Sequence, residues 1–208
     1  MDRHRIPRIK DSLNFLKESG YDITYALDIG VHSGTPWLQY SFPNAHYVLV
    51  EPNKNHNEQI HKNYANFSYE LKNVALGKRK EKLANLNLIG EEPYASDIVT
   101  LDSLDIIPSG KSLFKLDVDG YEMDVLQGGI ETFPMFDLLI IESKLDVLND
   151  ITGIVEDNSF RLWDIVNLDY EHGNLAQVDL IFKKNNFVTK PVAGYLDYQF
   201  FRQGSELQ

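Results

Sequence analysis

Residues 113–129 read LFKLDVDGYEMDVLQGG, and the fold follows from this stretch. Residues 112–118 form an apolar run that is typical of a buried strand. Two acidic residues, Asp117 and Asp119, stand where this run ends. After Gly120, apolar residues recur at helical spacing, which predicts a helix. A buried strand that leads directly into a helix is the building unit of an α/β sheet with parallel strands.

Short apolar runs of the same kind recur along the chain, each predicting a strand, at 23–30, 45–51, 67–76 and 136–143. Helical patterns lie between them, and an amphipathic helix is predicted over 7–18, ahead of the first strand. Two further strand patterns, 160–166 and 177–184, have no helix between them, which predicts an antiparallel pair. The whole pattern predicts an α/β fold: a doubly wound, mostly parallel sheet with helices on both faces and an antiparallel C-terminal edge strand.

The chain shows no internal repeat and no clear linker, so we expect a single domain over 1–208. The expected parts are an N-terminal helix, a core and a C-terminal tail, at 1–22, 23–184 and 185–208. Residues 78–96 and 144–159 carry no motif that indicates chemistry.

Composition excludes several classes of function. The 208-residue chain has no cysteine, so it has no disulfide, no thiolate nucleophile and no cysteine-based zinc site. This fits a reducing compartment, and we expect a cytoplasmic protein. A formal net charge of −11 disfavours nucleic acid as a partner, because a phosphate backbone would be repelled. No secretory leader and no membrane span is expected from the charged N-terminus and the short apolar runs.

The residues that follow the predicted strands are expected to form one site, because ligands of open parallel sheets bind beyond the carboxyl ends of the strands. The first strand ends in DIGVHSG, in which Gly30 and Gly34 allow a tight turn close to a ligand. The second strand ends at Glu51, in a position from which a carboxylate accepts hydrogen bonds from ribose hydroxyls. A glycine turn beside an acidic strand end is typical of nucleoside binding.

Two classes of ligand use such a turn. Dinucleotides require G-x-G-x-x-G, and this chain has no third glycine in place. The spacing of Asp28, Gly30 and Gly34 instead resembles the first motif of class I S-adenosylmethionine-dependent methyltransferases. A nicotinamide-dependent oxidoreductase and a non-catalytic nucleoside-binding domain of the same fold remain as alternatives.

Residues 114–129, FKLDVDGYEMDVLQGG, resemble the K-I-D-V-E-G-x-E-x-x-V-L-x-G signature of the FkbM family of methyltransferases. The resemblance extends from Ala26 to Phe182 through further segments in order, ALDIGVHSG, VEPN, NVALG, TLDSL, LLIIES and AQVDLIF. Two departures are that Asp119 stands where the family usually has Glu, and that the first loop reads V-H-S where A-N-x is commoner.

The resemblance implies a Rossmann-like sheet of seven strands and transfer of a methyl group from S-adenosyl-L-methionine. The acceptor would be a hydroxyl of a sugar, glycan or small-molecule natural product. The residues implied to bind the cofactor are Asp28, Gly30, His32, Gly34, Glu51 and Asn73. Pairing of two copies into a homodimer, through a sheet edge or the N-terminal helix, is left open.

The acidic cluster of the fourth strand is expected to form the reaction centre, with Asp117, Asp119 and Glu122 as candidate catalytic residues. Asp117 would act as a base, orient the hydroxyl or bind a divalent ion such as Mg²⁺ or Mn²⁺. The alternative is structural: Asp119 would cap the following helix and Glu122 would favour its N-terminal dipole.

Other side chains have a weaker claim to a role. Lys115 lies two residues before Asp117 on the same strand face and is expected to form an ion pair with a neighbouring carboxylate. His32 and His172 are alternative general bases, although surface loop histidines often have no chemical role. Glu142 ends the fifth strand, on the side where an acceptor would bind.

Overall fold

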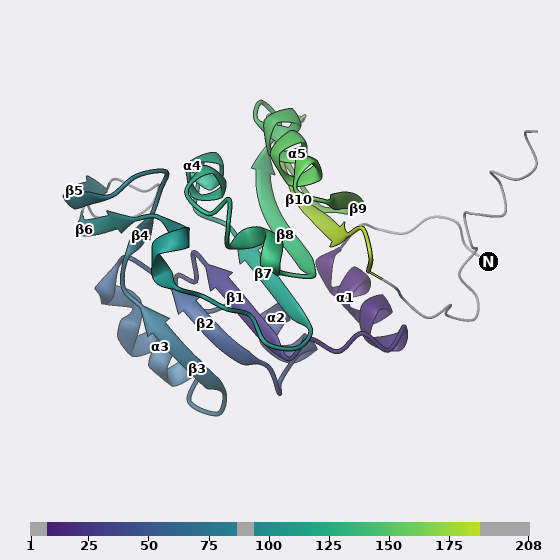
Figure 1. Cartoon of the computed structure of the whole chain (residues 1–208), viewed down its shortest axis with the longest axis horizontal. Coiled ribbons are helices and arrows are strands. Elements are labelled where there is room, and N and C mark those ends of the chain that lie inside the picture. Colours follow the sequence, from purple (N-terminus) through teal and green to yellow (C-terminus); the bar gives the residue numbers. More distant parts are fainter. Residues whose placement is uncertain (1–7, 87–93, 188–208) are drawn as a thin grey trace, which may run out of the picture.

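The computed structural model describes residues 8–86 and 94–187, and its centre is a sheet of seven strands (Figure 1). The strand order is β3-β2-β1-β7-β8-β10-β9. The bounds of these strands are β1 Tyr25–Ile29, β2 His46–Val50, β3 Ser68–Lys72, β7 Ser112–Leu116, β8 Leu138–Lys144, β9 Phe160–Glu171 and β10 Asn174–Lys184. No helix in the described part of the chain is both long enough and apolar enough to cross a membrane.

Strands β3, β2, β1, β7 and β8 pair in parallel, whereas β10 pairs antiparallel with both β8 and β9. The predicted α/β fold with a mostly parallel sheet and an antiparallel C-terminal strand is therefore confirmed. The C-terminal strand β10 lies between β8 and β9, so that β9 is at the sheet edge. The first strand, β1, lies between β2 and β7, where the strand order reverses and ligands of such sheets bind.

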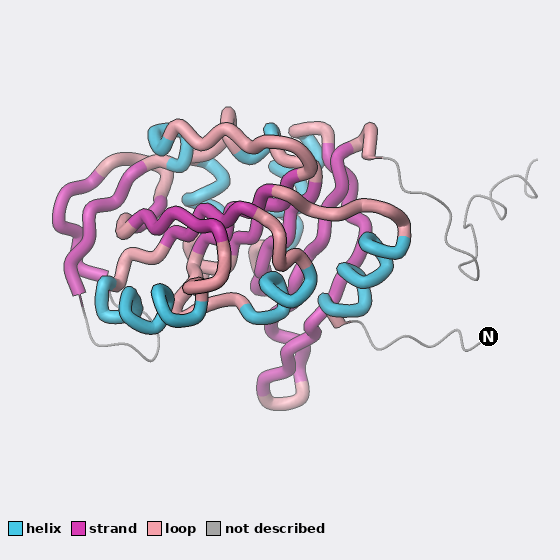
Figure 2. Tube along the Cα trace, turned by 90° about the horizontal axis from the view of Figure 1, so that it is seen from below, coloured by secondary structure: helices cyan, strands magenta, loops and turns pink. Residues whose placement is uncertain are grey.

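Helices cover both faces of this sheet (Figure 2). The helices are α1 Ile9–Glu18, α2 Pro36–Ser41, α3 Asn57–Asn63, α4 Glu122–Gln127 and α5 Leu148–Asp157, with short 3-10 helices η1 Lys54–His56, η2 Leu101–Leu104 and η3 Phe133–Met135. Buried residues of α1, α2 and α3 pack against one face, and those of α4, α5, η2 and η3 pack against the other. The central strands are buried on both faces, and their successive side chains point to opposite faces, which explains the two hydrophobic cores.

Three elements differ from the sequence prediction. The strand predicted over 67–76 is two strands, because the chain leaves the main sheet after Lys72. Its second part, β4 (Ala75–Leu76), joins β5 (Glu81–Leu86) and β6 (Tyr94–Val99) in a separate three-stranded sheet. Helix α5 occupies the region 144–159, for which no element was predicted.

Parts of the predicted regions lie outside the described residues. They are the start of the N-terminal segment, the middle of the 78–96 region and most of the predicted tail, at 1–7, 87–93 and 188–208.

The double glycine that ends the quoted stretch is a packing feature. A Cβ atom on Gly128 would lie 2.2 Å from the carbonyl oxygen of Gly77, which leads from β4 to β5. A Cβ atom on Gly129 would lie 2.4 Å from Leu101. Asp102, in the TLDSL segment, accepts hydrogen bonds from two backbone N–H groups that follow α4, at 2.9–3.4 Å. These contacts fasten the small sheet to the end of α4.

Candidate functional site

A cavity of about 280 Å³ lies at the carboxyl ends of β1, β2 and β7. One side is polar and consists of the first loop and carboxylates, chiefly Gly30, His32, Glu51, Asp117 and Asp119. The other side is apolar and includes Val74, Leu76 and Ile98, the last two from the small sheet. We call this the first cavity. The first cavity lies beyond the carboxyl ends of the strands, as the sequence predicted.

Gly30 is required by the close approach of two strand ends. Its φ is +78°, and a Cβ atom there would lie 1.6 Å from the carbonyl oxygen of Asp117. The backbone N–H of Asp117 donates to the carbonyl oxygen of Ile29 at 3.2 Å. The backbones after β1 and β7 therefore come together at the floor of the first cavity, with no room for a side chain between them.

Glu51 holds the first loop in place. It is 5% exposed, and its two carboxylate oxygens accept hydrogen bonds from the backbone N–H groups of His32, at 2.7 Å, and Asn53, at 2.8 Å. His32 has a positive φ of 51°, and its ring packs against that of His56 with centroids 4.0 Å apart. A carboxylate oxygen has more than one acceptor direction, so Glu51 retains capacity for a ligand hydroxyl.

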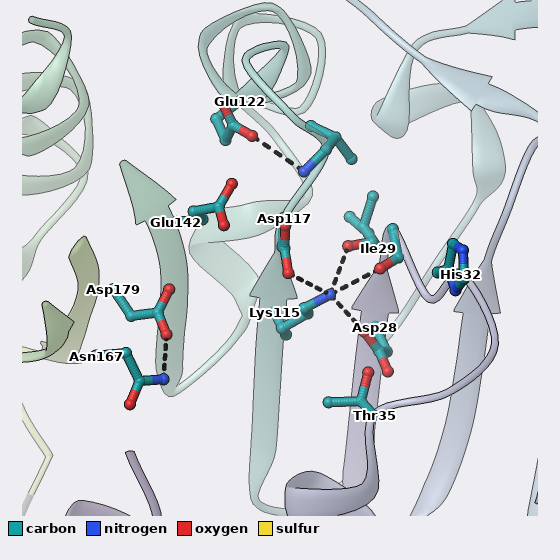
Figure 3. A network of polar contacts seen from close by, with 12 residues as sticks. Asp28, Ile29, His32, Thr35, Lys115, Asp117, Glu122, Glu142, Asn167 and Asp179 are labelled. Carbon is teal, nitrogen blue, oxygen red and sulfur yellow. Dashed lines mark hydrogen bonds and ion pairs between the residues drawn. The ribbon is translucent and has the colours of Figure 1, made fainter. Parts of the chain in front are cut away.

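Asp28 lies beneath the first cavity and is not among its lining residues. Figure 3 shows Lys115 at the centre of the network that surrounds it. The ammonium of Lys115 lies 3.3 Å from Asp28 Oδ1 and 3.2 Å from Asp117 Oδ2, and it donates to the carbonyl oxygen of Gly30 at 2.8 Å. The predicted ion pair of Lys115 is confirmed.

The carboxylates around Lys115 keep its buried ammonium charged. Lys115 is 4% exposed and Asp28 is fully buried. Burial alone would lower the pKa of Lys115, but attraction to Asp28 and Asp117 outweighs it, so the pKa is raised. Asp28 also accepts a hydrogen bond from the hydroxyl of Tyr64 at 3.3 Å, and burial, with the charge of Asp28, raises the pKa of that hydroxyl. Lys115 therefore stays charged and joins the ends of β1 and β7.

Glu122 and Asp119 have different surroundings from Asp117. Glu122 is 2% exposed, and its Oε1 accepts the backbone N–H groups of Val118, at 3.0 Å, and Gly120, at 3.1 Å. Asp119 has a positive φ of 53° and lines the first cavity. The alternative in which Asp119 caps the next helix is wrong, because the N-cap of α4 is Tyr121, without a side-chain capping bond. Glu122 is the first residue of α4, where its charge suits the helix dipole.

A divalent metal is not supported by this arrangement. In the part of the chain that the structure describes, no group of three or more His, Asp and Glu side chains is placed to hold a metal ion. Two carboxylates of the acidic cluster already have other partners. Asp117 pairs with Lys115, and Glu122 accepts backbone N–H groups of its own loop.

A second cavity, of about 300 Å³, adjoins the first. Its lining residues come from α2, β7, β8, β9 and β10 and are Trp37, Lys115, Leu116, Asp117, Ile140, Glu142, Asn167, Asp169, Gln177 and Asp179. Asp117 lines both cavities. The carboxyl end of β7 therefore separates two neighbouring cavities.

The second cavity is acidic. Glu142 and Asp179 are register partners on β8 and β10, and Asn167 donates to Asp179 at 2.6 Å. Burial, followed by repulsion from nearby carboxylates, raises the pKa of Glu142 to about 8. Burial is also the main reason why the pKa of Asp179 is raised to about 6. Both groups therefore hold protons more strongly than exposed carboxylates do.

Three residues expected to bind a cofactor lie beside the first cavity and do not line it. They are Asp28, Gly34 and Asn73. Gly34 has a φ of +139° and packs near Asn63. Asn73 pairs its amide with that of Asn57 and donates to the carbonyl oxygen of Glu51 at 2.9 Å. His172 lies at the turn between β9 and β10 and is not a lining residue of either cavity.

The residues that β9 and β10 contribute to the second cavity were not predicted from the sequence. Asp179 lies in the apolar run VDLIF, and a carboxylate within such a run was the available signal. Asn167, Asp169 and Gln177 each lie between apolar or aromatic residues, and in such an alternating pattern nothing distinguishes them from the solvent-facing positions of a strand.

Comparison with known proteins supports the fold. No protein-family model matches the chain, and no curated protein does. Among solved structures, the N-methyltransferase NodS from Bradyrhizobium japonicum WM9, in complex with S-adenosyl-L-homocysteine, is similar with a TM-score of 0.53 and 11% identity, over 84% of this chain and 85% of that one. The 23S rRNA methyltransferase ErmE is similar with a TM-score of 0.50 and 11% identity, over 98% of this chain and 78% of that one. At such identity the likeness concerns the fold.

Proposed function

We propose that this chain is an S-adenosylmethionine-dependent methyltransferase that methylates a hydroxyl group of a sugar, glycan or related small molecule. The observation that carries the proposal is that Asp117 lines both cavities. A methyl transfer needs a donor and an acceptor held side by side, in line with the transferred group. The first cavity would hold the donor and the second the acceptor.

The first cavity suits S-adenosylmethionine better than a dinucleotide. Its described lining includes the carboxylates of Glu51, Asp117 and Asp119 and no lysine or arginine. Such a lining attracts the ammonium and sulfonium charges of S-adenosylmethionine and repels a pyrophosphate. Glu51 is placed to accept ribose hydroxyls, and the apolar side with Val74 suits a base.

The second cavity suits an uncharged acceptor with several hydroxyl groups. Its carboxylates and the amides of Asn167 and Gln177 are hydrogen-bonding partners for hydroxyls, and Trp37 offers an apolar surface. Even with Glu142 protonated, the remaining carboxylates outnumber the one lysine and would repel a phosphate group. The resemblance of residues 114–129 to the FkbM signature favours the same class of acceptor.

The chain's own residues would bind and align the reactants. S-adenosylmethionine supplies a methyl group on a positively charged sulfur. Gly30 allows the close floor of the first cavity, and Glu51 holds the first loop in the conformation that lines this cavity. Asp117, held by Lys115, would orient the acceptor hydroxyl at the boundary between the cavities.

Two measurements test the proposal. S-adenosylhomocysteine should raise the melting temperature of the protein, because a ligand that binds only the folded state stabilises it. NADH is the matched control, and stabilisation by NADH alone would favour the oxidoreductase.

A methyl-transfer assay over neutral sugars, glycan fragments and nucleotide sugars, with and without EDTA, then identifies the acceptor. Transfer to no hydroxyl compound, despite binding of S-adenosylhomocysteine, would contradict the proposed acceptor class.

A further inference from the structure

We infer that Glu142 is the general base that accepts the proton of the acceptor hydroxyl, while Asp117 orients that hydroxyl. The inference rests on the proposed function, since it assigns roles within the second cavity. It separates two tasks that the sequence placed together on Asp117.

Glu142 is placed next to Asp117 by the sheet. Leu116 of β7 pairs with Ile141 of β8, so Asp117 and Glu142 are the next residues along two neighbouring parallel strands. Figure 3 shows the carboxylate of Glu142 turned toward Asp117. Both residues line the second cavity, and Asp117 also borders the first. A hydroxyl bound at this boundary would lie within reach of both carboxylates.

One carboxylate oxygen of Glu142 is fixed by a hydrogen bond from β10. Gln177 Nε2 on β10 donates a hydrogen bond to Glu142 Oε1, which sets the orientation of the carboxylate. Among the described residues, no hydrogen bond reaches Oε2. A half-buried carboxylate that lines a cavity and is held in orientation through one oxygen is suited to accept a proton from a bound ligand.

Asp117 is less suited to that task. The ammonium of Lys115 lies 3.2 Å from Asp117 Oδ2 and also lies against Asp28. Because Lys115 is 4% exposed, water cannot easily replace Asp117 as its partner. Proton transfer to Asp117 would remove a charge on which a buried ammonium depends. Asp117 is therefore better suited to hold and orient the hydroxyl.

The surroundings of Glu142 favour its protonated form after the reaction. The charged groups near it come from the loop before α4, from α4 and from β7, β9 and β10: Asp119, Glu122, Asp117, Lys115, Asp169 and Asp179. Burial, with repulsion from most of these carboxylates, raises the pKa of Glu142 to about 8. A base whose pKa lies near the working pH serves a weakly acidic hydroxyl better than an ordinary carboxylate does.

The acceptor oxygen forms a bond to the methyl carbon, the carbon–sulfur bond breaks with its electron pair remaining on sulfur, and the hydroxyl proton passes to Glu142. The proton then leaves Glu142 for solvent before the next turnover. No oxidant, reductant or further reactant is needed.

The test measures the titration of Glu142 and the reaction separately. Carbon-13 NMR of the protein labelled at glutamate carboxyl carbons should show one resonance that titrates near pH 8 and is missing from Glu142→Gln. Single-turnover methyl transfer should rise with pH through the same midpoint, and Glu142→Gln should be about 10²–10⁴-fold slower and lack that rise. Calorimetry should show that Glu142→Gln binds S-adenosylhomocysteine as the wild type does, which also shows that the variant is folded.

Asp179→Asn distinguishes a base from a structural residue. It removes one negative charge that raises the pKa of Glu142, so the NMR midpoint and the midpoint of the rate profile should move down together. The inference is overturned if all glutamate resonances titrate close to the ordinary value of 4.5, or if Glu142→Gln keeps the rate and pH profile of the wild type. A wild type that binds no S-adenosylhomocysteine would instead overturn the proposed function.

Discussion

Asp28 and Lys115 are register partners on β1 and β7, and Asp28 Oδ1 lies 3.3 Å from Lys115 Nζ with both side chains buried. Asp28 belongs to the first strand of the chain and Lys115 to the fourth strand of the main sheet. The pair therefore joins residues that are 87 positions apart in the sequence. A buried pair of this kind is destabilising to break, since one charge remains without its partner. The pair therefore fixes the strand ends at the boundary of the two cavities.

Lys115→Met should lower the free energy of unfolding by about 3–5 kcal/mol, because Asp28 would remain buried without a counter-charge. Urea unfolding measures this loss. The matched control is Lys72→Met, which removes the half-buried partner of the exposed Glu70 and should cost less than about 1 kcal/mol. Adding Asp28→Asn to Lys115→Met should recover part of the loss. Equal effects of the two lysine substitutions would show that burial of the pair does not matter.

Gly30→Ala should lower the free energy of unfolding by at least about 2 kcal/mol, because a Cβ atom would lie 1.6 Å from the carbonyl oxygen of Asp117 at a positive φ. Gly153→Ala is the control. Gly153 lies in α5, and a Cβ atom added there would meet no neighbouring atom within 4 Å, so alanine should stabilise by about 0.5–1 kcal/mol. A tolerated Gly30→Ala would mean that the floor of the first cavity can move apart.

Glu51→Ala should weaken binding of S-adenosylhomocysteine by about 1–3 kcal/mol in calorimetry, through loss of a charged acceptor and of the bonds to His32 and Asn53. Glu70→Ala, an exposed carboxylate on β3, should bind the ligand as the wild type does. Unchanged affinity in Glu51→Ala would remove Glu51 from the donor site.

Asp117→Asn should reduce methyl transfer strongly and weaken binding of S-adenosylhomocysteine far less, because that ligand lacks the sulfonium charge and Glu51 and Asp119 remain in the lining. The reason is that asparagine keeps the shape at the cavity boundary but loses the charge that pairs with Lys115. Asp124→Asn, on the exposed side of α4, is the control and should leave turnover unchanged. Normal turnover in Asp117→Asn would contradict a role for Asp117 at the reaction centre.

Asp179→Asn should flatten the dependence of stability on pH. The pKa of Asp179 rises from 3.8 to about 6 on folding, so the folded state binds more protons and stability falls as pH increases between these values. The substitution removes this loss, which we expect to be about 1–3 kcal/mol at pH 7. Urea unfolding at pH 5, 6 and 7 measures it, with Asp169→Asn, an exposed neighbour in the same cavity, as control. Parallel pH profiles for Asp179→Asn and the wild type would contradict the raised pKa.

Local patterns were enough to predict the main sheet. The runs that form β1, β2, β7 and β8 are apolar because both faces of a parallel sheet are covered, and their order along the chain follows from alternation with helices. The small sheet was not predicted, because β4 has two residues and pairs with β6, more than 20 residues away. Such pairings are not encoded in local periodicity.

The first cavity could be predicted in part, since Gly30, Glu51 and Asp117 follow strands whose carboxyl ends meet at one edge. The second cavity could not. Its residues come from distant segments, and β10 runs antiparallel, so Gln177 and Asp179 reach the site from the early part of their strand and not from its carboxyl end.

The hairpin of β9 and β10 divides the site along the chain. It supplies Asn167, Asp169, Gln177 and Asp179 to the second cavity, whereas every described residue that lines the first cavity lies at or before Tyr121. Under the proposed function, exchanging this hairpin between proteins of the same architecture would replace these four side chains on the acceptor side and none that line the first cavity. One contiguous segment would thus be a means of altering the acceptor side, with Trp37 and Glu142 left in place.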